Sequence, residues 1–181
     1  MRRAMLPTNL NTKRLLLRAP VPADAAQIFD SYARLPEVSR FMMWRPHSQF
    51  ATVEVFVGEC VAAFQSGARL PYILALAGEP RTPIGMLEAR PLGHKVELGY
   101  VLAPSFWGRG FMPEAISALT KEALAEPSFF RVQAFCDVEN VNSQRALEKS
   151  DFVREGRHDR FNVHPNLSAA PRPCFMYAKC R

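Results

Sequence analysis

The sequence lacks long apolar runs, closely spaced cysteines and metal-ligand motifs. Its longest apolar run covers residues 72–77, far short of the roughly 18 residues that a membrane-spanning helix needs. The four cysteines form no CxxC pair, so we predict reduced, mostly buried thiols rather than disulfide bonds or zinc ligands. The four histidines show no HExxH-type spacing, and we therefore expect no bound metal.

Blocks of consecutive basic residues are also missing, although the net charge is +6. Because a nucleic-acid site usually carries a basic patch interleaved with aromatic residues, we expect no direct binding of nucleic acid. The positive charge suits an acidic protein surface or a polyphosphate cofactor, and equally a merely soluble surface. Polar residues follow Arg2 and Arg3, which argues against a signal peptide and predicts a cytoplasmic location.

The apolar content, by contrast, is sufficient for a substantial core. The chain has 181 residues, of which 48% are hydrophobic and 22% are charged. These proportions are typical of a soluble globular protein, and the length is near the size of one domain. We therefore predict a single domain that spans residues 1–181.

Hydrophobic periodicity divides the chain into elements in the order βααβββαβαββ, which predicts an α/β (α+β) fold. A mixed sheet of about seven strands, flanked by about four helices, accounts for this order. We expect helices at 22–35, 50–67, 112–125 and 142–150, and strands at 14–20, 71–78, 83–91, 95–104, 131–138, 152–161 and 174–180. Strand 95–104, helix 112–125 and strand 131–138 form a βαβ unit, which requires one parallel pair in an otherwise antiparallel sheet.

The stretch SFWGRGFMPEA (105–115) lies between a predicted strand and a predicted helix. Gly108 and Gly110 permit positive φ angles and close backbone approach, and a helix start leaves several N–H groups unpaired. Arg109 adds a positive charge between them. The corner therefore fits a phosphate or pyrophosphate, and the alternative is a plain tight turn.

Two other nucleotide motifs are excluded at this corner. A P-loop needs Gly-Lys-Ser/Thr at the helix start, whereas Phe111 and Met112 follow Gly110. A dinucleotide fingerprint needs a third glycine where Pro113 stands.

Four motifs in residues 97–152 carry a resemblance to a known family: ELGY (97–100), WGRG (107–110), EA (114–115) and NVNS (140–143). With the opening TKRLLLRAPVPADAAQIF (12–29), they make the chain closely similar to the GNAT acetyltransferase superfamily. Within it, the chain resembles the RimJ/RimL-type branch, which acetylates protein N-termini and related amines. The resemblance implies the GNAT acyl-CoA N-acyltransferase fold with acetyl-CoA as co-substrate.

The resemblance also implies where CoA binds. The loop expected to wrap the pyrophosphate with its backbone N–H groups consists of Trp107, Gly108, Arg109, Gly110, Phe111 and Met112. The preceding strand is expected to bulge at Gly99 and to splay from its parallel neighbour, so that the backbone of Val101 and Leu102 meets pantetheine and the acetyl carbonyl. Asn140 matches the position that contacts the CoA arm. Asn140 and Ser143 also fit the alternative of ordinary helix caps.

In this family an amine attacks the thioester directly, within a ternary complex. Glu97 is the candidate general base, because it shares a strand face with Gly99 and Val101; the alternative is an exposed strand glutamate. Ser143 is the candidate acid near the sulfur, since Leu147 occupies the place of the usual tyrosine. Tyr100 and Tyr177 are the substitutes for Ser143.

Another departure from the family pattern is Asp151, which stands where a glycine is usual and so predicts a turn residue with positive φ. Family members shape the acceptor pocket with the segments that correspond to 36–49 and 158–173. The first contains the FMMW cluster, Phe41 to Trp44, which either lines that pocket or packs between helices.

The expected acceptor is a protein N-terminal amine. Such an amine has a pKa of about 7.7–8.0, so its deprotonation at pH 7 costs about 1 kcal/mol. Deprotonation of a lysine side chain at the same pH costs about 4.6 kcal/mol. A small-molecule amine (an amino acid, polyamine or antibiotic) is the alternative acceptor, and a non-catalytic acyl-CoA sensor is the alternative class. The sequence leaves open whether the chain forms a homodimer.

Overall fold

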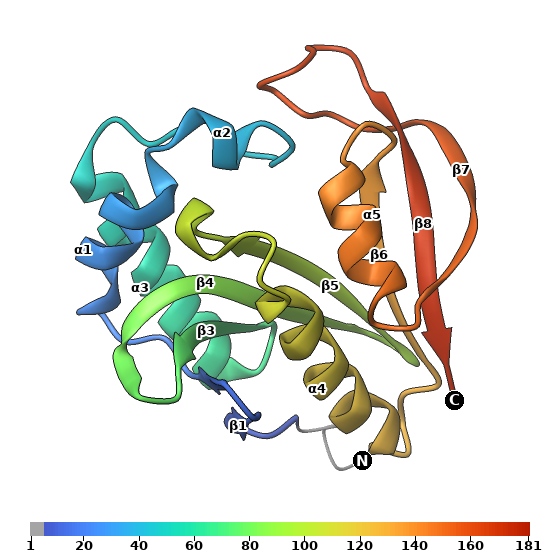
Figure 1. Ribbon diagram of the computed structural model, residues 1–181, viewed down its shortest axis with the longest axis horizontal. Coiled ribbons are helices and arrows are strands. Elements are labelled where there is room, and N and C mark those ends of the chain that lie inside the picture. The colour runs from blue at the N-terminus through green and yellow to red at the C-terminus, as the bar shows by residue number, and fades with distance from the viewer. Residues whose placement is uncertain (1–5) are drawn as a thin grey trace.

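The computed structural model describes residues 6–181, which form one mixed β-sheet with helices on both faces (Figure 1). Within these residues the sheet has eight strands in the order β1-β2-β3-β4-β5-β6-β8-β7. The strands are β1 (Asn9–Asn11), β2 (Leu15–Arg18), β3 (Leu70–Leu76), β4 (Glu79–Leu92), β5 (Lys95–Leu102), β6 (Arg131–Asp137), β7 (Val153–Asn162) and β8 (Arg172–Cys180). The helices are α1 (Asp24–Ile28), α2 (Pro36–Ser39), α3 (Phe50–Ser66), α4 (Phe111–Ala125) and α5 (Val141–Glu148).

The predicted α/β (α+β) class and the single parallel pair are confirmed. β5 and β6 are parallel, and the other neighbouring strands are antiparallel. β1 and α2 were not predicted, so the described sheet has eight strands rather than about seven, and five α-helices rather than about four flank it. With three and four residues, β1 and α2 are too short to show a hydrophobic period. The predicted helix 22–35 is α1 followed by a π-helical turn, Phe29–Ala33.

β5 and β6 run side by side for three residue pairs and then diverge (Figure 1). The pairs are Lys95 with Arg131, Val96 with Val132, and Glu97 with Gln133. On its other side, β5 stays paired with β4 as far as Leu102, opposite Gly85. The sheet is therefore open between residues 98–102 of β5 and residues 134–137 of β6, a feature that we call the fork.

Helices cover both faces of the sheet and divide the core in two. α1 and α3 pack on one face, where Val53, Val57 and Cys60 of α3 follow the predicted steps of three and four residues. α4 and α5 pack on the other face, where Ile116 and Leu119 of α4 are fully buried. The strands beside the fork are thus held from both sides, and they carry the loops that follow β5 and β6 on a rigid frame.

The predicted bulge at Gly99 is wrong. The pairing of β4 with β5 continues along the whole of β5 without a register shift. Gly99 instead makes room for a neighbour, because a Cβ at this position would lie 2.8 Å from Nη2 of Arg90. The strand separates from β6 without a bulge, at the last parallel pair.

The predictions for the cysteine thiols and for Asp151 are confirmed. Cys60, Cys136 and Cys174 are buried and free, and Cys180 is free and exposed. Asp151 adopts a φ of 61° in the turn after α5. Among the described residues, no helix combines the length and the apolar character needed to cross a bilayer.

Candidate active site

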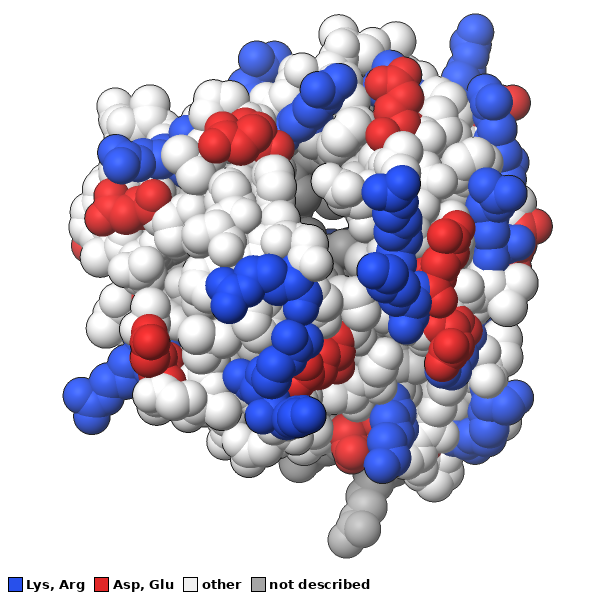
Figure 2. Space-filling view, viewed as in Figure 1, with Lys and Arg blue, Asp and Glu red and all other residues white. Residues whose placement is uncertain are grey.

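A cavity of about 950 Å³ occupies the fork. The loop before α4 and the start of α5 line one end, and residues 37–44 together with β4 line the other. In the space-filling view, a hollow opens beside the region of α5 (Figure 2). The volume lies at the upper end of the range of about 300–1,000 Å³ that is usual for small-molecule and cofactor sites.

The loop between β5 and α4 presents its backbone to this cavity. Gly108 and Gly110 adopt φ angles of 72° and 79°, the left-handed conformation that glycine permits. α4 begins at Phe111 without a side-chain cap, and the Glu114 N–H donates to the Gly110 carbonyl. The N–H groups of Phe111 and Met112 therefore have no acceptor within the helix. Together with the helix dipole, these groups form a corner suited to an anion.

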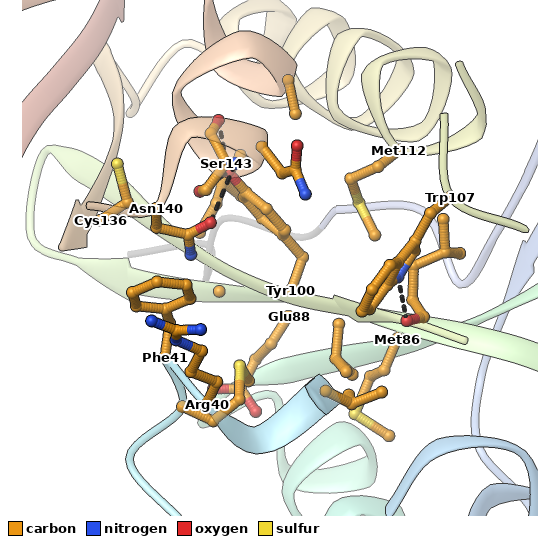
Figure 3. Close-up of a pocket in the computed structure, with 18 of the residues that line it drawn as sticks. Arg40, Phe41, Met86, Glu88, Tyr100, Trp107, Met112, Cys136, Asn140 and Ser143 are labelled. Carbon is orange, nitrogen blue, oxygen red and sulfur yellow. Dashed lines mark hydrogen bonds between the residues drawn. The ribbon is translucent and has the colours of Figure 1, made fainter. Parts of the chain in front are cut away.

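Of the predicted loop residues, Trp107, Gly108, Gly110, Phe111 and Met112 line the cavity. The Trp107 indole N–H donates to the Leu102 carbonyl at 2.7 Å and so ties the loop back to the end of β5 (Figure 3). Arg109 does not line the cavity, because its guanidinium group stacks 5.1 Å from the Phe111 ring centroid. Arg109 thus contributes its charge near the corner rather than a direct contact with the cavity.

Backbone groups of β5 alternate between β4 and the open side of the fork. The Ala103 N–H donates to the Ile84 carbonyl of β4 at 2.8 Å. Val101 lies two residues before Ala103, so its N–H and C=O groups also face β4. In agreement, a side chain at Gly85 of β4 would collide with the Val101 carbonyl oxygen. The backbone groups of Tyr100 and Leu102 face the fork instead. This corrects the expectation for Val101, whose side chain lines the cavity but whose backbone is occupied.

Ser143 and Tyr100 face each other within the cavity (Figure 3). Their hydroxyl oxygens lie 2.7 Å apart. Burial raises the pKa of Tyr100 above its ordinary value, so the phenol keeps its proton at neutral pH. Asn140 Oδ1 accepts a hydrogen bond from the Ser143 N–H at 3.2 Å and caps α5. Asn140 thus fits the cap interpretation while also lining the cavity, and the Ser143 hydroxyl remains directed at Tyr100.

Tyr177, the other substitute acid, lies outside the cavity lining. Its hydroxyl is fully buried and donates to Glu148 at 3.0 Å. Burial and the neighbouring Glu148 raise the pKa of Tyr177 to about 12. Among the described lining residues, only Tyr100 and Ser143 carry hydroxyl groups.

Glu97 lies at the base of the fork and outside the cavity lining. Its carboxylate accepts hydrogen bonds from Arg90 Nη1 at 3.3 Å and from Gln133 Nε2 at 3.0 Å. Because Glu97 and Gln133 form the last parallel pair, their side chains join β5 and β6 where the backbones separate. Arg131 extends this polar network by donating to Gln133 at 2.9 Å and to Glu155 of β7 at 2.7 Å. Glu97 is thus one member of a network that spans the sheet.

Replacing Glu97 with glutamine is expected to leave kcat within about twofold of wild type, because the carboxylate does not face the cavity. Loss of the partly exposed ion pair with Arg90 is expected to lower the free energy of unfolding by about 0.5–1 kcal/mol. Steady-state rates across pH and thermal unfolding measure the two effects. A large loss of kcat at low and neutral pH would contradict this expectation and return the role of general base to Glu97.

The end of the cavity opposite α4 is lined by residues from 36–49 and 158–173, the two segments that the resemblance assigns to the acceptor pocket. All four residues of the FMMW cluster line the cavity, which supports the pocket interpretation over simple packing. Asn166 joins the segments, because its Nδ2 donates to the carbonyls of Ser39 at 2.6 Å and Trp44 at 2.7 Å. One wall of the cavity therefore depends on contacts between segments more than 100 positions apart.

Sequence reasoning missed several residues of the cavity lining, among them Glu88 and Cys136. Glu88 lies on β4 opposite Gly99, and its carboxylate pairs with Arg69 and Arg90 at 2.5 Å each. A single acidic residue in the apolar stretch IGMLEA (84–89) was the available signal. A lone cysteine gives no such signal, and burial raises the pKa of the Cys136 thiol to about 12.

Basic side chains outnumber acidic ones along the cavity. Figure 2 shows Lys and Arg side chains on both sides of the hollow. In the part of the chain that the structure describes, no group of three His, Cys, Asp or Glu residues is placed to hold a metal. The lining therefore favours an anionic ligand. The charged lining residues are Arg40, Arg69, Arg90, Arg145 and Lys149 against Glu37 and Glu88.

Comparison with known proteins agrees with this arrangement. A family model described as an acetyltransferase (GNAT) domain matches residues 14–153. The chain belongs to the GNAT acetyltransferase family. It is accordingly an N-acetyltransferase, and the mixed sheet with its fork is the GNAT fold.

Relatives and solved structures extend over most of the chain. The uncharacterized N-acetyltransferase p20 of Bacillus licheniformis is 27% identical over 150 residues, which cover 81% of this chain and 83% of the relative. A GNAT-family acetyltransferase from Bacillus anthracis has a TM-score of 0.82 at 24% identity, over 95% of this chain and 98% of that chain. RimL, a ribosomal L7/L12 alpha-N-protein acetyltransferase in complex with coenzyme A, has a TM-score of 0.81 at 19% identity, over 97% of each chain. RimJ/RimL-type acetyltransferases are thus among the structural neighbours of this GNAT protein, as the sequence predicted.

Proposed function

We propose that this protein transfers an acetyl group from acetyl-CoA to a primary amine in a ternary complex, and that the acceptor is a protein N-terminus. The observation that carries the proposal is the cavity in the fork. One end meets the unpaired N-terminus of α4, and the other end meets the acceptor segments. Donor and acceptor can then enter from opposite ends and meet between β5 and β6, as direct attack requires.

The donor is assigned to the α4 end of the cavity. The N–H groups of residues 108–112 hold the CoA pyrophosphate, and Arg109 adds charge nearby. The Leu102 carbonyl accepts from Trp107, so the Leu102 N–H and the backbone groups of Tyr100 take the pantetheine and acetyl positions that the resemblance implies for this strand. Asn140 borders the CoA arm. RimL, a structural neighbour, was solved with coenzyme A, which supports this donor.

The chemistry needs a neutral amine and a protonated leaving group. The amine nitrogen bonds to the thioester carbon, the C–S bond breaks, and the departing sulfur takes a proton from the Ser143 and Tyr100 hydroxyl pair. The nitrogen loses one proton as it becomes an amide, and that proton returns to the hydroxyl pair. Removing the proton from an N-terminal ammonium group at pH 7 costs about 1 kcal/mol. A base that is linked to the amine through water is therefore sufficient. We assign that base to Glu88, since it lines the cavity, rather than to Glu97.

The acceptor assignment draws on charge and on the neighbours. A lining with more basic than acidic residues disfavours polycationic acceptors such as polyamines and aminoglycosides. RimL is an alpha-N-protein acetyltransferase of ribosomal L7/L12, which supports a protein N-terminus. Free amino acids remain the alternative, because most carry one amine and a carboxylate, which a lining with more basic than acidic residues accepts.

The test is thiol release from acetyl-CoA with a panel of N-terminal peptides, free amino acids, polyamines and aminoglycosides, with CoA binding measured on the same sample. Turnover with peptides alone is the expected result. Turnover with a small amine alone would replace the acceptor, and tight CoA binding without turnover would favour the acyl-CoA sensor.

A further inference from the structure

Arg14 joins the N-terminal strands to the corner before α4. Its Nη1 donates to the Arg109 carbonyl at 3.0 Å, and its Nε donates to Glu114 Oε2 at 2.6 Å. The centre of its guanidinium group lies 4.4 Å from the Phe111 ring centroid, within the range of a cation–π contact. One side chain therefore contacts the loop, the helix start and the first turn of α4, although it lies 95 positions before the loop in the sequence.

The bond to the Arg109 carbonyl sets the direction of the next amide. In a planar trans peptide, the carbonyl of one residue and the N–H of the next point in opposite directions. With the Arg109 carbonyl turned toward Arg14, the Gly110 N–H points away from Arg14. Gly110 lines the cavity and Arg14 does not, so this arrangement keeps a loop donor available to the cavity.

Arg14 and Thr12 also engage Glu114, a carboxylate in the first turn of α4. Glu114 Oε1 accepts hydrogen bonds from Thr12 Oγ1 at 2.6 Å and from the Arg14 N–H at 2.9 Å. Burial alone would raise the pKa of Glu114, but the hydrogen bonds from Thr12 and Arg14 and the charge of Arg14 outweigh it and hold that pKa below its usual range. An acidic side chain in a first turn often folds back onto free helix N–H groups, where it would compete with an anionic ligand. Here it is held by the N-terminal strands instead.

We propose that Arg14 is a positioning residue for the CoA diphosphate. It orients the loop amides and neutralises Glu114, so that the N-terminus of α4 stays open to the phosphates. This inference rests on the proposed binding of acetyl-CoA. The contacts of Arg14 with the Arg109 carbonyl and Glu114 are called the clamp. A positioning role differs from a purely structural role in its specificity, because only the binding of ligands that carry the diphosphate depends on the clamp.

The test compares binding of CoA with binding of pantetheine, which lacks the diphosphate and the 3′-phosphoadenosine attached to it, by titration calorimetry. For Arg14→Gln we expect the CoA dissociation constant to rise about tenfold, equivalent to about 1.4 kcal/mol, with pantetheine affinity unchanged. Arg14→Lys keeps the charge but not the two directed donors, so an intermediate rise is expected, and this variant carries the test if Arg14→Gln fails to fold. Glu114→Gln combined with Arg14→Gln is expected to bind CoA no more weakly than the worse single variant, because both act through one clamp.

Arg157→Gln is the matched control, since it removes one arginine from an exposed ion pair on β7 with Asp159. CoA affinity in Arg14→Gln equal to that of the control, or an equal loss of pantetheine affinity, would overturn the inference while leaving the proposed function intact. Failure of the wild-type protein to bind CoA would instead overturn the proposed function, and the inference with it.

Discussion

Replacing Gly85 with alanine is expected to lower the free energy of unfolding by about 3 kcal/mol, at the upper end for overpacking in a core. A Cβ at Gly85 would collide with the Val101 carbonyl oxygen and would lie 3.0 Å from Leu102 Cδ1 and 3.1 Å from Leu102 Cα. Backbone atoms of a central strand cannot rotate away, so β5 would have to move at the edge of the fork. Thermal unfolding should show a loss of about 6–12 °C in Tm for a chain of this length.

Gly58→Ala is the matched control for this glycine. Gly58 is exposed in the middle of α3, and a Cβ there meets no atom within 4 Å. The same chemical change should therefore stabilise the helix by up to about 1 kcal/mol, because alanine has the higher helix propensity. A Gly85→Ala protein as stable as Gly58→Ala would show that β4 and β5 can separate freely, and would contradict the close approach of Gly85 to the Val101 carbonyl oxygen.

Replacing Ser143 with alanine is expected to lower kcat about a hundredfold, the lower part of the usual range for a positioned proton donor. The hydroxyl lies 2.7 Å from the Tyr100 hydroxyl, and these are the two hydroxyl groups among the described lining residues. CoA affinity is expected to stay near wild type, because the cap from Asn140 uses the backbone N–H of residue 143, which alanine retains. Rates of thiol release at saturating substrate, together with CoA titration, separate the two quantities.

Tyr100→Phe and the double variant show whether the two hydroxyls act as one unit. If they do, the double variant is expected to be no slower than the slower single variant. Ser128→Ala provides a control, since Ser128 is an exposed serine whose hydroxyl contacts Glu126. Unchanged kcat in Ser143→Ala would remove Ser143 from the mechanism, and weakened CoA binding with unchanged kcat would make it a binding residue instead.

Much of the fold could be predicted from the sequence because its signals are local. α3 and α4 carry apolar residues at helical spacing, and the strands lie between turn residues, so the positions of the longer elements follow from short stretches. The left-handed conformations of Gly108, Gly110 and Asp151 follow from residue type and turn position in the same way. The missed elements, β1 and α2, are shorter than the period that would reveal them.

The candidate site could be predicted only in part, because register decides which groups of a strand face the cavity. Strand alternation alone placed Glu97, Gly99 and Val101 together, but the pairing with β6 and β4 assigns Glu97 to the base of the fork and the Val101 backbone to β4. The strand carboxylate that lines the cavity is Glu88, which comes from β4, the neighbouring strand.

The sequence by itself determined the longer elements, the glycine corner with its free helix N-terminus, and the likeness to one family, since each depends on residues close together in the chain. Only the tertiary structure decided which side chains meet. The pairing of Tyr100 with Ser143 and the clamp of Arg14 on Arg109 and Glu114 span 43 to 100 positions. Such contacts arise from strand order and helix packing, and no local pattern of residue types encodes them.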